Sequence, residues 1–145
     1  MTGVWVAVAT VTLGVVVGLG RLLLDGRLRV KGGSMVTADA LGAPLGERAT
    51  LVQFSTAFCQ PCRATRRILD EVAAMVPGVA HVEIDAESRL DLVKELDVMR
   101  TPTVLVLDSR GAIVKRASGQ PRKADVIAAL GMAVSHEPSH NADEM

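Results

Sequence analysis

The sequence of 145 residues is poor in aromatic side chains and in cysteine. Phe, Trp and Tyr together make up 2% of the chain, and Tyr is absent, so Val, Leu, Ile and Ala must supply the hydrophobic core. The 16 basic and 16 acidic side chains cancel to a net charge of zero, which gives no reason to expect nucleic acid as a partner. The length provides for one domain and an appendage.

Charge is also missing from the N-terminal segment. No charged side chain occurs between Met1 and Gly20, and residues 22–24 extend the apolar run beyond Arg21. The run reaches the roughly 20 residues that a helix needs to cross a bilayer. A cleaved signal peptide is the alternative, but it would begin with a positively charged region and end at a small-residue cleavage site, and neither is evident. We therefore expect residues 1–24 to form a retained transmembrane anchor.

The charges beside this segment predict its orientation. Basic side chains follow it closely in the sequence: Arg21, Arg27, Arg29 and Lys31. Because positive charge is retained on the cytoplasmic side of a membrane, the domain that follows is expected to face the cytoplasm. The rule is statistical, so an extracytoplasmic domain is kept as the alternative.

Hydrophobic patterns and turn residues divide the rest of the chain. Residues 25–48 are expected to be a basic juxtamembrane segment and linker with a short helical turn at 37–41, residues 49–134 a compact domain, and residues 135–145 a disordered tail. Strands are predicted at 51–54, 79–84, 103–107 and 112–117, and helices from the cysteines to 76, at 88–97 and at 123–134. The inward-facing helix residues are expected to include Leu90, Val93, Leu96, Val126, Ile127 and Leu130. This order predicts an α/β fold, a small mixed sheet with helices on both faces.

The only two cysteines stand two residues apart, in Cys59-Gln60-Pro61-Cys62. They lie where the first predicted strand ends and a helix begins, and the N-terminus of a helix stabilises a thiolate. A structural zinc site needs four ligands, and the sequence has no second cysteine pair to supply them. A purely structural disulfide would close too small a ring to stabilise the fold much. The pattern therefore favours reversible dithiol–disulfide chemistry.

Three motifs together resemble those of the thioredoxin family, over about residues 49–130. They are Phe58-Cys59-Gln60-Pro61-Cys62, Thr101-Pro102-Thr103, and Ser109-Arg110-Gly111 followed by Gly119. The resemblance implies a thioredoxin-like mixed sheet flanked by helices and the activity of a thiol–disulfide oxidoreductase.

The resemblance also implies roles for individual residues. Cys59 would be the nucleophile that attacks a target disulfide, and Cys62 the resolving thiol. Pro102 matches the family's cis-proline, which faces the cysteine pair and lets the backbone of Thr101 pair with a substrate segment. Gln60 and Pro61, between the cysteines, would tune the reduction potential.

Two further positions depart from the family pattern. Phe58 stands where the family usually has Trp. Gln53 stands where thioredoxins usually have a buried aspartate that takes the proton from the resolving cysteine, and a Gln side chain cannot accept that proton. A slow resolving step is therefore expected. The family's matching lysine aligns with His81, which either forms a polar contact with Gln53 or acts as a general base.

Other charged groups yield weaker expectations. Arg63, Arg66 and Arg67 follow the second cysteine and either favour a Cys59 thiolate or form a solvated helix face. His136 and His140 are separated by Pro138, which disfavours a metal site on a helix.

The sequence thus predicts a membrane-anchored thiol–disulfide oxidoreductase that binds no metal and no cofactor. Its substrates would be proteins with disulfides, and by resemblance its electron donor would be a thioredoxin reductase using NADPH. Two alternatives are kept: an extracytoplasmic, client-specific reductase of the cytochrome c maturation type, and a tethered binding module of the same fold without catalysis.

Overall fold

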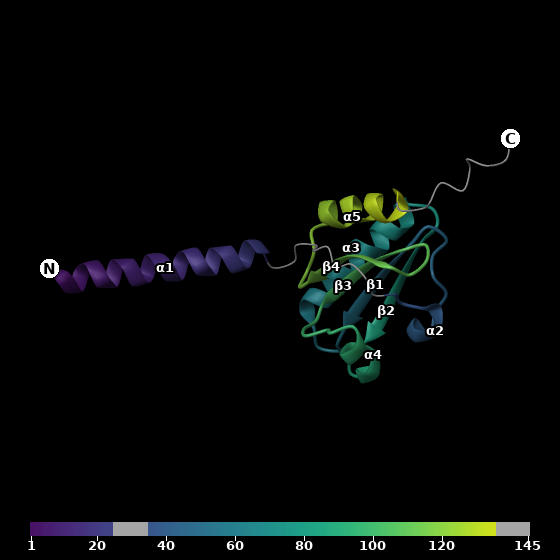
Figure 1. Ribbon diagram of the computed structural model, residues 1–145, viewed down its shortest axis with the longest axis horizontal. Coiled ribbons are helices and arrows are strands. Elements are labelled where there is room, and N and C mark those ends of the chain that lie inside the picture. Colours follow the sequence, from purple (N-terminus) through teal and green to yellow (C-terminus); the bar gives the residue numbers. More distant parts are fainter. Residues whose placement is uncertain (25–34, 136–145) are drawn as a thin grey trace.

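The computed structural model describes residues 1–24 and 35–135 (Figure 1). The described elements, in chain order, are α1 (Thr2–Leu24), α2 (Ala38–Leu41), β1 (Ala49–Ser55), α3 (Gln60–Met75), β2 (Val79–Asp85), α4 (Leu90–Glu95), β3 (Thr103–Asp108), β4 (Ile113–Ser118) and α5 (Lys123–Ser135). The four predicted strands and three predicted helices of the domain are confirmed, with ends that shift by a few residues.

A four-stranded mixed sheet with the order β2-β1-β3-β4 forms the centre of the domain. β1 pairs parallel with β2 and antiparallel with β3, while β4 pairs antiparallel with β3 at the edge. β1 and β3 are buried along their whole length, as a continuous apolar run predicts for strands covered on both faces.

Helices cover both faces of this sheet, as expected (Figure 1). On one face, Leu51 and Val104 pack with Leu69 and Val72 of α3 and with Val126 of α5. The core on the other face contains α2, α4 and these strand residues: Val52, Phe54, Leu105 and Leu107. The single buried aromatic side chain of this core, Phe54, reflects the shortage of aromatics in the sequence.

Packing of the domain begins before residue 49. The Val36 N–H donates to the Gly111 carbonyl at 2.8 Å, and Val36 and Leu41 are both buried in the core. Thr37 caps α2 through its side chain. Part of the stretch assigned to a linker therefore packs against the domain, and two isolated apolar residues among Gly, Pro and polar residues gave no periodic signal of this.

Two residues expected to point inward do not. Leu90 is 59% exposed because α4 begins there rather than at residue 88, and Leu92 is buried in its place. Ile127 is 41% exposed, since the buried stripe of α5 consists of Val126, Ala129, Leu130 and Ala133. That stripe follows the helical spacing from Val126, which leaves the adjacent residue on the outer face.

Among the described residues, α1 is the one helix that is both long enough and apolar enough to cross a membrane. Its side chains over Thr2–Arg21 are not buried against the rest of the protein. A signal sequence near an N-terminus passes the same test. The basic residues Arg27, Arg29 and Lys31 and the histidines at 136 and 140 lie outside the described residues.

Glycine at position 111 is required for two reasons. Its φ of 91° favours Gly, and a Cβ there would meet the Val36 carbonyl oxygen, whereas Gly42, with φ of 70°, faces open space.

The two glycines predict different losses of stability. Gly42→Ala should lower the free energy of unfolding by about 1 kcal/mol, because of the left-handed backbone alone. Gly111→Ala should cost clearly more, because it also displaces the Val36 backbone. Urea unfolding of the full chain in detergent, followed by circular dichroism, measures both free energies. Equal losses of stability would contradict the close approach of Gly111 to the Val36 carbonyl.

Candidate active site

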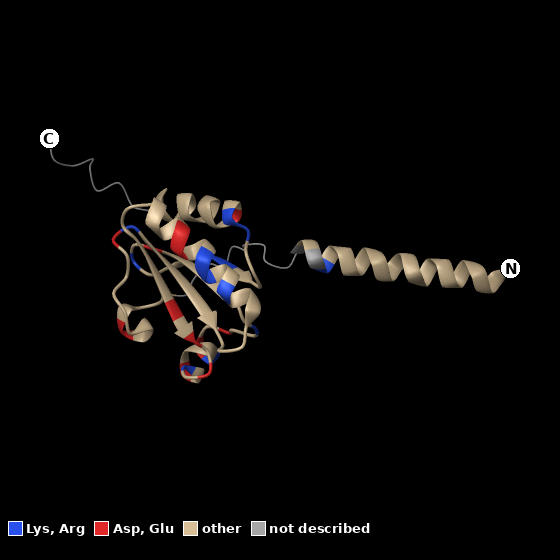
Figure 2. Cartoon of the chain, turned by 180° about the vertical axis from the view of Figure 1, so that it is seen from behind, with Lys and Arg blue, Asp and Glu red and all other residues tan. Residues whose placement is uncertain are grey.

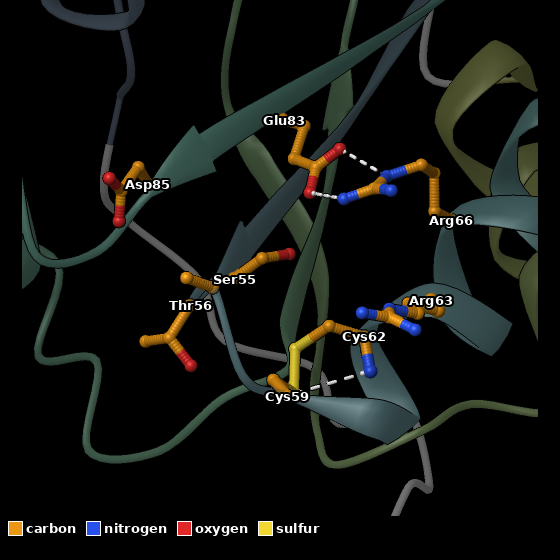
Figure 3. A pocket seen from close by; sticks show the side chains of 9 residues that line it. Ser55, Thr56, Cys59, Cys62, Arg63, Arg66, Glu83 and Asp85 are labelled. Carbon is orange, nitrogen blue, oxygen red and sulfur yellow. Dashed lines mark hydrogen bonds and ion pairs between the residues drawn. A yellow bond between two sulfur atoms is a disulfide. The ribbon is translucent and has the colours of Figure 1, made fainter.

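The cysteine pair lies at the junction of β1 and α3. Cys59 is the N-cap of α3, with Pro61 in the first turn, and the Cys62 N–H donates to Cys59 Sγ at 3.2 Å. The two sulfurs form a disulfide, with the Cα atoms 5.2 Å apart (Figure 3). Cys62 is 1% exposed, whereas Cys59 is only partly buried. When the bond is reduced, the helix N-terminus and this N–H would stabilise a thiolate on the more accessible sulfur.

The segment Thr101-Pro102 lies beside this junction, as the resemblance implies. Its peptide bond is cis, and Pro102 is buried. The hydroxyl of Thr101 is 3.5 Å from that of Thr56, which lies in the loop leading to Cys59. The Gly119 N–H donates to the Pro102 carbonyl at 2.7 Å and connects this segment to the end of β4.

The residues around and between the cysteines form an exposed rim. Phe58 is 96% exposed, and Gln60 and Pro61 are also exposed. An exposed aromatic ring next to Cys59 offers apolar surface to a protein that approaches the disulfide.

Gln53 is fully buried beneath the cysteines. Its amide nitrogen donates to the Cys62 carbonyl at 2.8 Å and to Ser55 Oγ at 2.9 Å. Its Oε1 has no hydrogen-bond partner among the described residues. The side chain therefore ties the first turn of α3 to β1.

The expected polar contact between Gln53 and His81 is wrong. His81 Nδ1 lies 2.6 Å from an oxygen of Asp70 on α3, and the hydrogen bonds of Gln53 go elsewhere. The strand register explains this, because it pairs His81 with Leu51 and places Glu83 opposite Gln53. The base role considered for His81 gains no support, since this side chain does not line the pocket beside the cysteines.

A pocket of about 490 Å³ opens beside the disulfide (Figure 3). Its lining comes from β1, α3, β2 and their connecting loops: Ser55, Thr56, Ala57, Cys59, Cys62, Arg63, Arg66, Glu83 and Asp85. Ser55, Glu83 and Asp85 were not predicted from the sequence. Side-chain alternation places Glu83 on the same face of β2 as His81, and that signal could have found it.

Glu83 and Arg66 form a bidentate ion pair across this pocket. Arg66 Nε and Nη2 each donate to a different oxygen of the Glu83 carboxylate at 2.5 Å. The hydrogen bond and charge of Arg66 lower the pKa of Glu83, with a smaller contribution from the Ser55 hydroxyl, and partial burial opposes the shift. Arg63 stands exposed at the same pocket, and no hydrogen bond of its side chain to the described residues is seen.

A dithiol pair at a helix N-terminus, on a mixed sheet flanked by helices, defines a thiol–disulfide oxidoreductase of thioredoxin fold. Comparison with known proteins identifies the family. The family model described as Thioredoxin matches residues 38–131, so the chain belongs to the thioredoxin family.

Individual relatives agree with this. The chain is 30% identical to a thioredoxin of Mycolicibacterium smegmatis over 101 residues, which cover 68% of this chain and 87% of that protein. It is 28% identical to rice (Oryza sativa subsp. japonica) thioredoxin H5 over 72 residues, which are 50% of this chain and 53% of the relative. Chloroplastic thioredoxin z shares the fold, with a TM-score of 0.58 at 23% identity over 74% of this chain and 98% of that one.

The hydrogen bonds of Gln53 predict a stability effect. Gln53→Leu would remove the hydrogen bonds that this side chain donates to the Cys62 carbonyl and to Ser55 Oγ, at a cost of about 1–3 kcal/mol in the free energy of unfolding. The exposed Gln120→Leu is the matched control and should be nearly neutral. Urea unfolding of the oxidised protein measures both, and a Gln53→Leu protein as stable as the control would refute the role.

Proposed function

We propose that the chain is a membrane-tethered reductase of protein disulfides, with Cys59 as the nucleophile and Cys62 as the resolving thiol. The observation that carries the proposal is the unequal exposure of the two cysteines at the N-terminus of α3. A protein disulfide can approach Cys59 from solvent, while Cys62 is buried behind it and has access mainly to Cys59.

The reaction then has two exchange steps. The Cys59 thiolate attacks one sulfur of the target disulfide, forms a mixed disulfide and releases the first target thiolate. Cys62 loses its proton and attacks Cys59 Sγ, which closes the Cys59–Cys62 disulfide and releases the second target thiol. Two electrons pass from this chain to the target, and the sulfurs carry them without a bound cofactor.

The surroundings of Cys59 supply the proposed substrate contacts. The Thr101-Pro102 segment lies against the cysteine loop through Thr56, and Phe58 extends the apolar rim. An extended target segment would pair with the Thr101 backbone while its disulfide meets Cys59. The electron donor proposed for the return to the dithiol is a thioredoxin reductase, by relation to the family.

Single cysteine variants test the order of the two thiols. Cys59→Ser should reduce a disulfide-bonded protein such as insulin only at the background rate and form no covalent intermediate. Cys62→Ser should also lose turnover but accumulate a mixed disulfide through Cys59, because nothing releases it. Non-reducing electrophoresis and mass spectrometry distinguish the two. A mixed disulfide through Cys62 in the Cys59→Ser protein would reverse the assignment.

α1 is proposed to anchor the domain on the cytoplasmic side. Two reporters in a Cys59→Ser, Cys62→Ser background test this: Thr2→Cys at the start of α1 and Met99→Cys on the domain, at a position 84% exposed. In intact cells a membrane-impermeant maleimide should label Thr2→Cys, and Met99→Cys only after permeabilisation. The reverse pattern would indicate the extracytoplasmic reductase, and loss of the Thr2→Cys reporter from the mature chain would indicate a cleaved signal peptide.

A further inference from the structure

The resolving step needs a proton acceptor that position 53 does not provide. Cys62 must become a thiolate before it attacks Cys59, and the Gln53 amide nitrogen acts as a donor, to Ser55 Oγ and to the Cys62 carbonyl. Two carboxylates line the pocket that Cys62 shares: Glu83 and Asp85. Asp85 is engaged in the turn after β2, where it accepts from the Glu87 N–H and the Ser88 hydroxyl. Glu83 lies directly opposite Gln53 in the register of β1 and β2, which makes it the better placed of the two.

Gln53 and Ser55 connect Glu83 to the cysteine helix. One amide nitrogen of Gln53 donates both to the Cys62 carbonyl and to Ser55 Oγ. Because Ser55 Oγ accepts this bond, its own proton is free to donate toward the pocket, where the Ser55 hydroxyl contributes to the lowered pKa of Glu83. The register supports the arrangement, since Gln53 and Glu83 are direct partners across β1 and β2. Figure 3 shows the Ser55 oxygen between the Glu83 carboxylate and Cys62.

Arg66 fixes both the position and the charge of the carboxylate. The side chain of Glu83 is 30% exposed, so it is partly desolvated, and the bidentate pair holds it against α3. The charged or titratable groups facing it are Arg63 and Arg66 from α3, and His81 and Asp85 from β2, while Asp70 of α3 interacts with Arg66. β1 contributes only the neutral Gln53 and Ser55 on this side. The positive partner is the one in direct contact, so the carboxylate is ionised at neutral pH.

We propose that the Glu83 carboxylate, placed by Arg66 and Ser55, accepts the proton of Cys62 in the resolving step. The inference rests on the proposed order of the two thiols. The Cys62 S–H bond breaks, the proton passes through the pocket to Glu83, and the Cys62 thiolate attacks Cys59 Sγ. The Cys59–Cys62 bond forms, the bond from Cys59 to the target breaks, and the target thiolate then takes up the proton from Glu83. If Glu83 takes this proton, the slow resolving step that Gln53 led us to expect belongs to a Glu83 variant and not to the native chain.

Two variants that break the same ion pair test this. Glu83→Gln removes the acceptor, whereas Arg66→Gln keeps it and removes the group that lowers its pKa. Glu83→Gln should slow the decay of the mixed disulfide at neutral pH by about 100-fold, the lower end for general base catalysis. Formation of the mixed disulfide should stay near the native rate. Arg66→Gln should retain decay at neutral pH and shift the acidic limb of its pH profile to higher pH, since the pKa of Glu83 rises.

The measurement uses the full, reduced chain in detergent, mixed rapidly with oxidised insulin, quenched with acid and analysed by mass spectrometry. Glu83→Asp, which keeps a carboxylate, should recover part of the rate, and Glu95→Gln, exposed on α4, is the control for loss of one negative charge. A normal rate of mixed-disulfide formation shows that each variant is folded.

The outcomes separate the inference from the proposed function. Equal slowing by Glu83→Gln and Arg66→Gln would overturn the inference, because it would show that the ion pair acts only through structure. Native decay in Glu83→Gln would also overturn it while the order of the thiols stands. A native chain that forms no mixed disulfide through Cys59 would overturn both.

Discussion

The hydrogen bond from the Gln53 amide to the Cys62 carbonyl is the contact on which the arrangement of the site depends. It joins a fully buried position in the central strand β1 to the first turn of α3, within the part of the helix that holds both sulfurs. Since first-turn N–H groups of a helix have no intrahelical acceptor, the Cys62 N–H is available to Cys59 Sγ. The strand thus fixes the helix, and the helix fixes the electrostatic environment of the nucleophile.

This contact also shows how the family arrangement persists without its buried acid. A carboxylate at position 53 could accept a proton but could not donate to a carbonyl while ionised, whereas a Gln amide donates and stays neutral at any pH. Gln53 therefore cannot take up a proton and instead makes a structural hydrogen bond to α3. Because an ionised carboxylate buried without a partner is costly, the chain has a neutral group at the centre of the domain and its carboxylate at the pocket, paired with Arg66.

The sequence predicted most of the fold because each element carries its own local signal. Continuous apolar runs marked β1 and β3, Pro77-Gly78 marked the end of α3, and Gly111 marked the hairpin. The start of the domain was not predicted, because Val36 enters the core beside a hairpin about 75 residues away in the chain, through a hydrogen bond to the Gly111 carbonyl that no local pattern indicates. Leu90 was wrongly expected to point inward because the helix start was placed two residues early: Leu90 is the first residue of α4, whereas Val93 and Leu96 pack on the core as predicted.

The candidate site divides in the same way. The cysteines and the Thr101-Pro102 segment are short motifs and could be located from the sequence. The residue of β2 that lies opposite Gln53, however, depends on the register between β1 and β2, which no local pattern specifies. The register places Glu83, not His81, opposite Gln53, and it changes the expected chemistry. A carboxylate buried in an apolar interior has a raised pKa and titrates nearer to neutrality, whereas one paired with Arg is ionised well below it. An acceptor of the second kind is a weaker base, but its charge stays constant around neutral pH. With Glu83 in that role, the resolving step of this chain would lose its proton acceptor only in acid, where protonation of the Glu83 carboxylate breaks its ion pair with Arg66.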